Sequence, residues 1–66
     1  MTSYSSKELI KLLKEDGWFE VNRTGDHHQF KHNIKKGQVT LTHPKKDIPI
    51  GTAKSIAQQA GIKLPR

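Results

Sequence analysis

Gly25-Asp26-His27-His28-Gln29-Phe30-Lys31-His32 is the stretch that decides the fold, because it is typical of a turn followed by a strand with one buried face. Phe30 is the apolar residue of the run and is expected to point toward the core. Residues two apart in a strand share a face, so His28 and His32 are expected on the side of Phe30. His27 is then expected on the opposite, wetter side. Because histidine exchanges protons near neutral pH, His27 is the first candidate for chemistry on a ligand in solvent.

The sequence on both sides of this stretch predicts two further strands. Residues 19–22 alternate apolar and polar side chains, which indicates a first strand with one buried face. A turn at Thr24-Gly25-Asp26 joins it to the strand at residues 27–32. Residues 38–42 alternate in the same way, after a loop at residues 33–37 that holds Asn, Gly and two lysines. Such short connections predict an antiparallel meander.

A helix is predicted before the strands, at about residues 6–16, after a polar lead-in from Thr2 to Ser6. Ser5 and Glu8 have the spacing of a capping box. The leucines that follow form one apolar stripe at helical spacing. Gly17 stands where a left-handed C-cap residue is expected.

A second helix is predicted after the strands, with a narrow stripe of small residues. It is expected to start between Ile50 and Thr52 and to be capped by Gly61. The segment from Pro44 to Pro49 is expected to be a loop.

These elements predict a single α+β domain over residues 1–66, in the order helix, three strands, helix. Both helices are expected on one face of the three-stranded antiparallel sheet, with the other face open to solvent. This is the layout of double-stranded RNA-binding domains. The predicted core consists of Leu9, Ile10, Leu12, Leu13, Trp18, Phe19, Val21, Phe30, Val39, Leu41, Ile56, Ala57 and Ala60.

The amino-acid composition restricts the kinds of binding partner and compartment that are expected. Twelve Lys and Arg against six Asp and Glu give the 66-residue chain a net charge of +6, which points to a polyanion, most often nucleic acid, or to an acidic protein. The chain has no cysteine, which excludes disulfides and thiolate metal sites and fits a reducing compartment such as the cytoplasm. It has no long apolar run, so neither a signal peptide nor a membrane partner is expected.

Several motifs follow one another from Leu9 to Ile62, and together they resemble those of the HicA-like toxins, a family of small bacterial mRNA interferases. The motifs are Asp16 to Phe19, Thr24 to His32, Val39 to Pro44, Lys46 to Pro49, Gly51-Thr52, Ile56, and Gln59 to Ile62. The resemblance implies a double-stranded-RNA-binding-like fold, cleavage of mRNA without a cofactor, and neutralisation by a HicB-like antitoxin. It also implies that His27 is the catalytic histidine, because His27 matches the histidine of the family's Gly-Ser-His motif. Asp26 departs from this motif and places an anion beside the imidazole, and the loop at residues 33–37 also departs from the family's usual turn.

The residues themselves leave two other readings of His27 open: a surface histidine without a role, or a backbone contact in an RNA-binding module that cleaves nothing. A protein-interaction domain is a third possibility for the whole chain. His28 and His32 are expected to be satisfied polar groups on the buried side, and His43 is expected to hold the loop that follows it. A metal site is not expected, because His27 and His28 point to opposite faces and His28 lies roughly 13 Å from His32 in a regular strand.

Seven basic residues are the predicted RNA contacts. Most lie in loops around the sheet, while one lies near the start of the second helix, whose N-terminus also attracts anions. Lys31 lies roughly 13 Å from His27 along the strand and is expected to steer the substrate rather than to share its phosphate. The seven residues are Arg23, Lys31, Lys35, Lys36, Lys45, Lys46 and Lys54.

Overall fold

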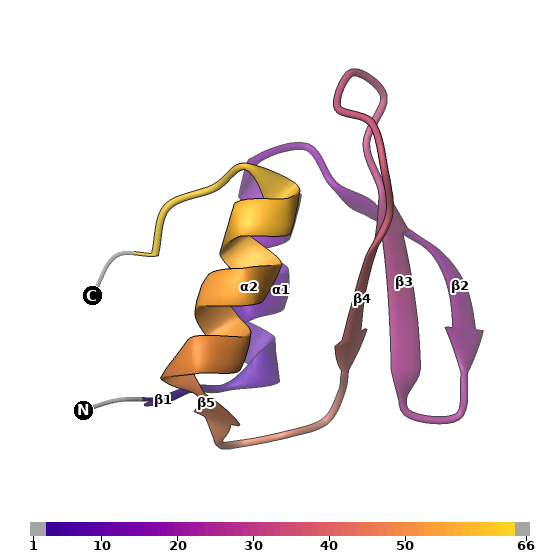
Figure 1. Ribbon diagram of the computed structural model, residues 1–66. Coiled ribbons are helices and arrows are strands. Elements are labelled where there is room, and N and C mark those ends of the chain that lie inside the picture. Colours follow the sequence, from indigo (N-terminus) through magenta and orange to yellow (C-terminus); the bar gives the residue numbers. More distant parts are fainter. Residues whose placement is uncertain (1–2, 65–66) are drawn as a thin grey trace.

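Two helices and a three-stranded antiparallel sheet form the core of the protein, in the predicted order (Figure 1). The computed structural model describes residues 3–64. Its main elements are α1 (Ser6–Glu15), β2 (Phe19–Thr24), β3 (His27–Lys31), β4 (Val39–Thr42) and α2 (Ile50–Ala60). The α+β class and the antiparallel meander β2-β3-β4 are therefore confirmed.

A second, two-stranded sheet was not predicted. β1 (Ser3–Tyr4) pairs with β5 (Ile48–Pro49), with Tyr4 opposite Ile48. The predicted polar lead-in and the predicted loop after Pro44 thus each contain a short strand, and the two strands pair with each other. Thr2, the first residue of the lead-in, lies outside the described residues. Strands of two residues are too short to show alternation, so only the pairing between distant segments reveals them.

α1 has the predicted caps at both ends. The Ser5 Oγ accepts the Glu8 N–H at 3.1 Å, and the Glu8 carboxylate accepts the Ser5 N–H at 2.9 Å. At the other end, Gly17 has a φ of +102°, and the Trp18 N–H reaches back to the Leu13 carbonyl at 2.9 Å. These are a capping box and a Schellman motif, so local chemistry is sufficient to start and stop this helix.

α2 begins at Ile50, within the predicted range, and packs on β4. Its N-cap is Pro49, which provides no side-chain hydrogen bond to the first turn. Gly61 ends it in the left-handed conformation, and the Ile62 N–H bonds to the Ala57 carbonyl at 2.9 Å. The first turn of α2 therefore has backbone N–H groups that no side chain caps.

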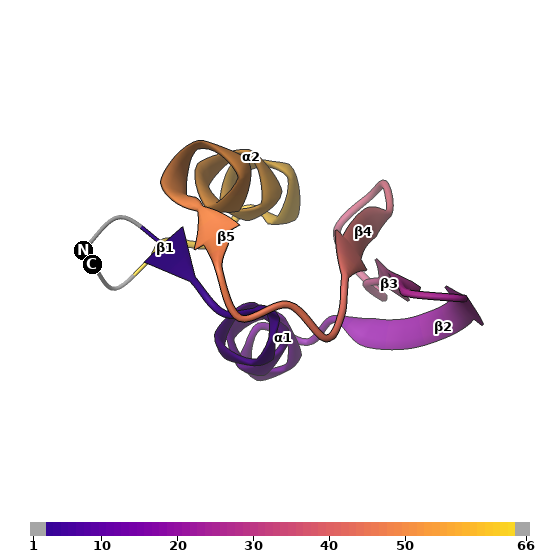
Figure 2. The same ribbon diagram turned by 90° about the horizontal axis from the view of Figure 1, so that it is seen from below.

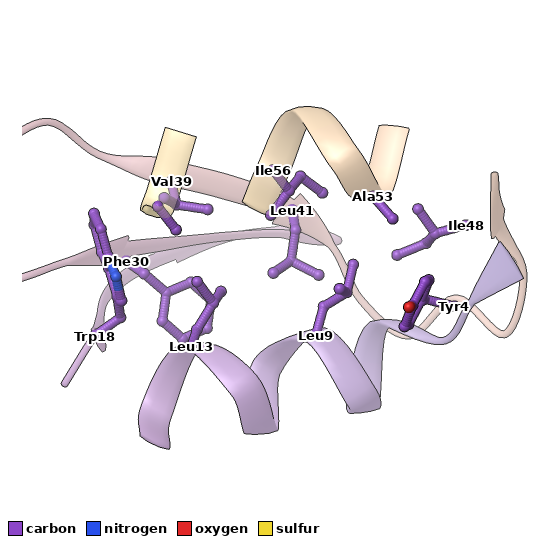
Figure 3. Close-up of a cluster of buried hydrophobic side chains, with 11 residues drawn as sticks. Tyr4, Leu9, Leu13, Trp18, Phe30, Val39, Leu41, Ile48, Ala53 and Ile56 are labelled. Carbon is purple, nitrogen blue, oxygen red and sulfur yellow. The ribbon is translucent and has the colours of Figure 1, made fainter. Parts of the chain in front are cut away.

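The core lies between the two helices and one face of the sheet (Figure 3). Trp18 packs at one end of the cluster, and Tyr4, Ile48 and Ala53 pack at the other. Figure 2 shows α1 and α2 running alongside each other to one side of the sheet. The predicted Ile10 and Leu12 are half-buried at the margin of this cluster.

The core prediction is wrong for the two apolar residues of β2. Phe19 and Val21 were expected in the core, but their side chains are 42% and 46% exposed. The pairing shifts between Glu20 and Asn22, so that Glu20, and not an apolar neighbour, lies opposite Phe30. This β-bulge breaks the alternation. β2 forms one edge of the sheet, whereas α2 packs on β4 at the other edge, away from the apolar residues of β2.

Candidate active site

His27 is the first residue of β3 and lies on the open face of the sheet. Its partners in the register are Thr24 of β2 and Thr42 of β4. His27 is exposed, whereas His28 is 5% exposed and Phe30 is fully buried, so the predicted separation by face is confirmed. Among residues 3–64, no side chain bonds to the His27 ring. Both ring nitrogens are therefore available to a ligand.

A groove of about 380 Å³ lies beside His27, between β4 and α2. The helix contributes Thr52, Ser55 and Gln59, which share one face because they are three and four residues apart. The groove therefore combines hydroxyl and amide groups with one imidazole and one ammonium group, and has no carboxylate in its lining. Its polar lining consists of His27, Thr40, Thr42, Lys45, Thr52, Ser55 and Gln59.

The ammonium group belongs to Lys45, whose backbone is held by buried Ser6 at the start of α1. The Ser6 N–H donates to the Lys45 carbonyl at 2.7 Å, and the Lys45 N–H donates to the Ser6 Oγ at 2.9 Å. The Ser6 Oγ also lies 2.6 Å from the His43 Nδ1. Because the hydroxyl accepts the Lys45 N–H, its own proton can be donated to His43. Lys45 thus lines the groove from a backbone whose N–H and carbonyl groups are both bonded to Ser6.

His28 and His43 belong to a polar cluster on the inner side of the sheet. Their rings meet edge to face, with centroids 5.1 Å apart. The His28 Nδ1 lies 3.2 Å from the Glu20 carboxylate, which also accepts the Arg23 Nε at 3.1 Å. These two hydrogen bonds hold the pKa of Glu20 below its ordinary value. The bond from Arg23 has the larger effect and the bond from His28 the smaller one. His28 and His43 are thus engaged in structural contacts, and His43 anchors the following loop through Ser6.

His32 connects the end of β3 to the C-terminus of α1. Its Nδ1 accepts the N–H groups of Ile34 and Lys35 at 3.0 and 3.1 Å. Its Nε2 lies 2.7 Å from the Asp16 carbonyl. Since Nδ1 accepts two hydrogen bonds, the ring proton is on Nε2 and is donated to that carbonyl. The ring also packs edge to face on Trp18, so His32 is a structural clamp.

The predicted RNA contacts divide between the two ends of the sheet (Figure 1). Lys45 and Lys46 lie in the loop after β4, at the end where His27 begins β3, and Lys45 lines the groove. Lys31 ends β3, and Lys36 follows in the loop at the opposite end. Lys54 lies on α2 but borders a different hollow, on the side of the helix away from the groove. The structure therefore brings one of the seven basic residues into the groove.

Lys35 is occupied by structural contacts. Its Nζ lies 2.5 Å from the Asp16 carboxylate and 3.1 Å from each of the Ala60 and Gly61 carbonyls. Its hydrogen bond to Asp16 is the main cause that lowers the pKa of that carboxyl below its ordinary value. Lys35 thus links the C-terminal ends of both helices, where a cation is stabilised by the helix dipoles.

Comparison with known protein families identifies the family of this chain. The family model that describes the HicA toxin of bacterial toxin–antitoxin systems matches residues 6–62. The chain belongs to the HicA toxin family. No curated protein matches it. The HicA segment contains both helices, the three-stranded sheet and the groove, whereas β1 precedes it.

Membership in a toxin–antitoxin family makes the protein a toxin that has an antitoxin partner. Within residues 3–64, neither helix has the length and apolarity needed to cross a membrane. In the same residues, no three His, Asp or Glu side chains come together as a set of metal ligands.

Sequence reasoning missed the groove because its two walls are distant in the chain. The N-terminus of the second helix was predicted to attract anions, but nothing pointed to Ser55 or Gln59. Ser6 was predicted only as the first residue of a helix. Ser6 is only 1% exposed and bonds to Lys45, because α1 packs against the loop after β4.

Proposed function

We propose that this protein is a ribonuclease that cleaves mRNA in the cytoplasm by histidine-dependent, metal-independent chemistry, and that a HicB-like antitoxin neutralises it. The observation that supports this most directly is the exposed His27, which no side chain of residues 3–64 engages, at a groove that Lys45 also lines. Phosphodiesters are anionic, and this groove presents an amine, hydroxyl groups and no carboxylate.

The chemistry uses the ribose 2′-OH as an internal nucleophile. A base removes its proton, the 2′-oxygen bonds to phosphorus, and the bond from phosphorus to the 5′-oxygen breaks as that oxygen takes a proton. The products are a 2′,3′-cyclic phosphate and a free 5′-OH. His27 is suited to one of the two proton transfers, and Lys45 is suited to stabilise the negative charge on the phosphorane.

The test is cleavage of matched RNA and DNA oligonucleotides by the purified chain. Single-stranded RNA is expected to be cut at the same rate with and without excess EDTA, and to leave cyclic phosphate ends. DNA of the same sequence lacks the 2′-OH and is expected to stay intact. Loss of activity on chelation, restored by a divalent ion, or cleavage of the DNA would contradict the proposed chemistry.

RNA binding is expected to be largely electrostatic and centred on the loop after β4. Lys45→Glu combined with Lys46→Glu is expected to weaken binding to all sequences alike, because phosphate contacts carry no sequence information. Each phosphate contact that is lost reduces the salt slope of affinity by about 0.7 on a single strand. The measurement is the Kd for labelled RNA at several salt concentrations.

The matched control for this charge reversal is Lys11→Glu combined with Lys14→Glu. It makes the same change in net charge on exposed positions of α1, which do not line the groove. We expect its affinity to fall much less. Equal losses in the two double variants would show that only net charge matters and that the loop is not the binding site.

The antitoxin is expected to cover the same groove. Acidic groups placed over Lys45 and Lys46 would exclude RNA by occupying its contacts. Adding a purified HicB-like partner is therefore expected to stop both RNA binding and cleavage.

A further inference from the structure

Phe19 is an aromatic ring on the open face of the sheet. It is 42% exposed and does not belong to the hydrophobic core cluster. The register of β2 and β3 places it directly opposite Lys31. Lys31 shares a face with His27, four residues before it in the same strand. Phe19, Lys31 and His27 therefore look out from the same side of the sheet.

The residues that pair across this face are polar apart from Phe19, and none of them is acidic. Glu20 is the one acidic residue of β2, β3 and β4, and it lies opposite Phe30 on the other face. Between Lys31 and His27, the face presents an amide pair in which the Asn22 Nδ2 lies 3.4 Å from the Gln29 Oε1. Amide and hydroxyl groups of this kind suit the edges and sugars of nucleotides. The face consists of Phe19, Asn22, Thr24, His27, Gln29, Lys31, Thr40 and Thr42.

We propose that Phe19 and Lys31 form a nucleotide subsite, in which the Phe19 ring stacks on one unpaired base of a single-stranded RNA and the Lys31 ammonium binds a neighbouring phosphate. The proposal rests on the proposed function and specifies its substrate as single-stranded. Aromatic rings on an open sheet are stacking platforms for unpaired bases, whereas bases within a duplex have no free face.

The position of the subsite indicates which nucleotide it binds. His27 and Lys31 are four positions apart in β3, which corresponds to roughly 13 Å. A base on Phe19 is therefore not at the cleaved bond but flanks it along the strand. The subsite thus holds the RNA across the sheet while the groove holds the phosphate that reacts.

A protein surface is a less suitable occupant of this subsite. Protein contacts are built on clustered apolar side chains. Lys31 lies opposite Phe19, and the next pair on this face is Asn22 with Gln29, whereas Val21 at the bulge is the one other exposed apolar residue of β2. One aromatic ring opposite a cation, with a single exposed aliphatic residue in the same strand, fits a stacked base and its phosphate better than a protein interface.

The experiment compares Phe19→Ala, Phe19→Leu and Phe19→Trp in a chain that also carries His27→Ala, so that bound RNA is not cut. The probe is a labelled single-stranded RNA, together with versions that lack one base at successive positions. Phe19→Ala and Phe19→Leu are expected to weaken binding by roughly 5-fold or more, and Phe19→Trp to retain or increase it. Removing the stacked base is expected to weaken binding of the parent chain but not of Phe19→Ala.

Two further readouts separate stacking from other roles. The indole introduced by Phe19→Trp is expected to be quenched by the RNA but not by the version without the stacked base. The thermal midpoints of the three variants are expected to match, because the ring is outside the core cluster.

The outcomes are distinguishable. If RNA binds and is cut in a His27-dependent way, but Phe19→Ala binds it as tightly as the parent chain, the subsite alone is overturned. If Phe19→Leu keeps RNA affinity but loses the antitoxin, the ring belongs to a protein interface, and the subsite is again overturned. If the parent chain binds no RNA at all, the proposed function and the subsite fail together.

Discussion

His27→Ala is expected to lower the rate of RNA cleavage by about 10²–10⁴-fold, the usual contribution of a positioned acid or base. The side chain is exposed and forms no bond among residues 3–64, so its removal opens no core cavity. The loss of unfolding free energy is expected to be below about 0.5 kcal/mol. The measurements are single-turnover cleavage, RNA affinity, thermal melting, and growth arrest on expression with co-purification of the antitoxin.

Two controls make this result specific. Gln58→Ala truncates another exposed polar side chain, on the side of α2 away from the groove, and is expected to cleave RNA at the wild-type rate. His28→Ala removes the neighbouring imidazole, which is buried against Glu20 and His43, and is expected to lower the thermal midpoint. The assignment fails if His27→Ala still cleaves RNA, or if it is inactive only because it has unfolded.

Gly17→Ala is expected to reduce the free energy of unfolding by about 2–4 kcal/mol. The φ of +102° at Gly17 strains any residue with a Cβ. An added Cβ would also lie 2.8 Å from the His32 Nε2, the atom that donates to the Asp16 carbonyl. The substitution therefore adds strain and displaces the His32 clamp. Thermal melting is expected to show a fall of more than about 8 °C in a domain of this size.

Gly37→Ala is the matched control for this prediction. Its φ of +92° is close to that of Gly17, but among residues 3–64 no atom lies within 4 Å of the position of its Cβ. It is expected to cost only the backbone strain, about 1–2 kcal/mol. Equal destabilisation by the two variants would show that the contact with His32 contributes nothing.

The four histidines show how the tertiary structure divides one residue type among different roles. His32 clamps the end of α1, and His28 packs against His43, whose ring holds Ser6. His27 makes no such contact within the described residues. The rings engaged in the fold are not available for chemistry, which leaves His27 as the candidate on geometric grounds.

The elements that could be predicted depend on contacts between near neighbours in the chain. The caps of α1 at Ser5 and Gly17 need residues no more than five apart, so the sequence by itself determined where that helix begins and ends. The faces of β3 follow from an alternation of period two around Phe30. The sequence alone also provides the net charge, the absence of cysteine and the order of the motifs. Together these already indicated a basic toxin of the HicA family.

Contacts between distant segments were decided only by the tertiary structure. The bulge in β2 exposes Phe19, because pairing with β3 and not local alternation sets which residues face the core. Lys45 and Lys35 are alike as loop lysines, yet one lines the groove beside His27 and the other links the ends of two helices. The role of a long, charged side chain depends on which distant acceptors its backbone position brings within reach, and no local pattern encodes those distances.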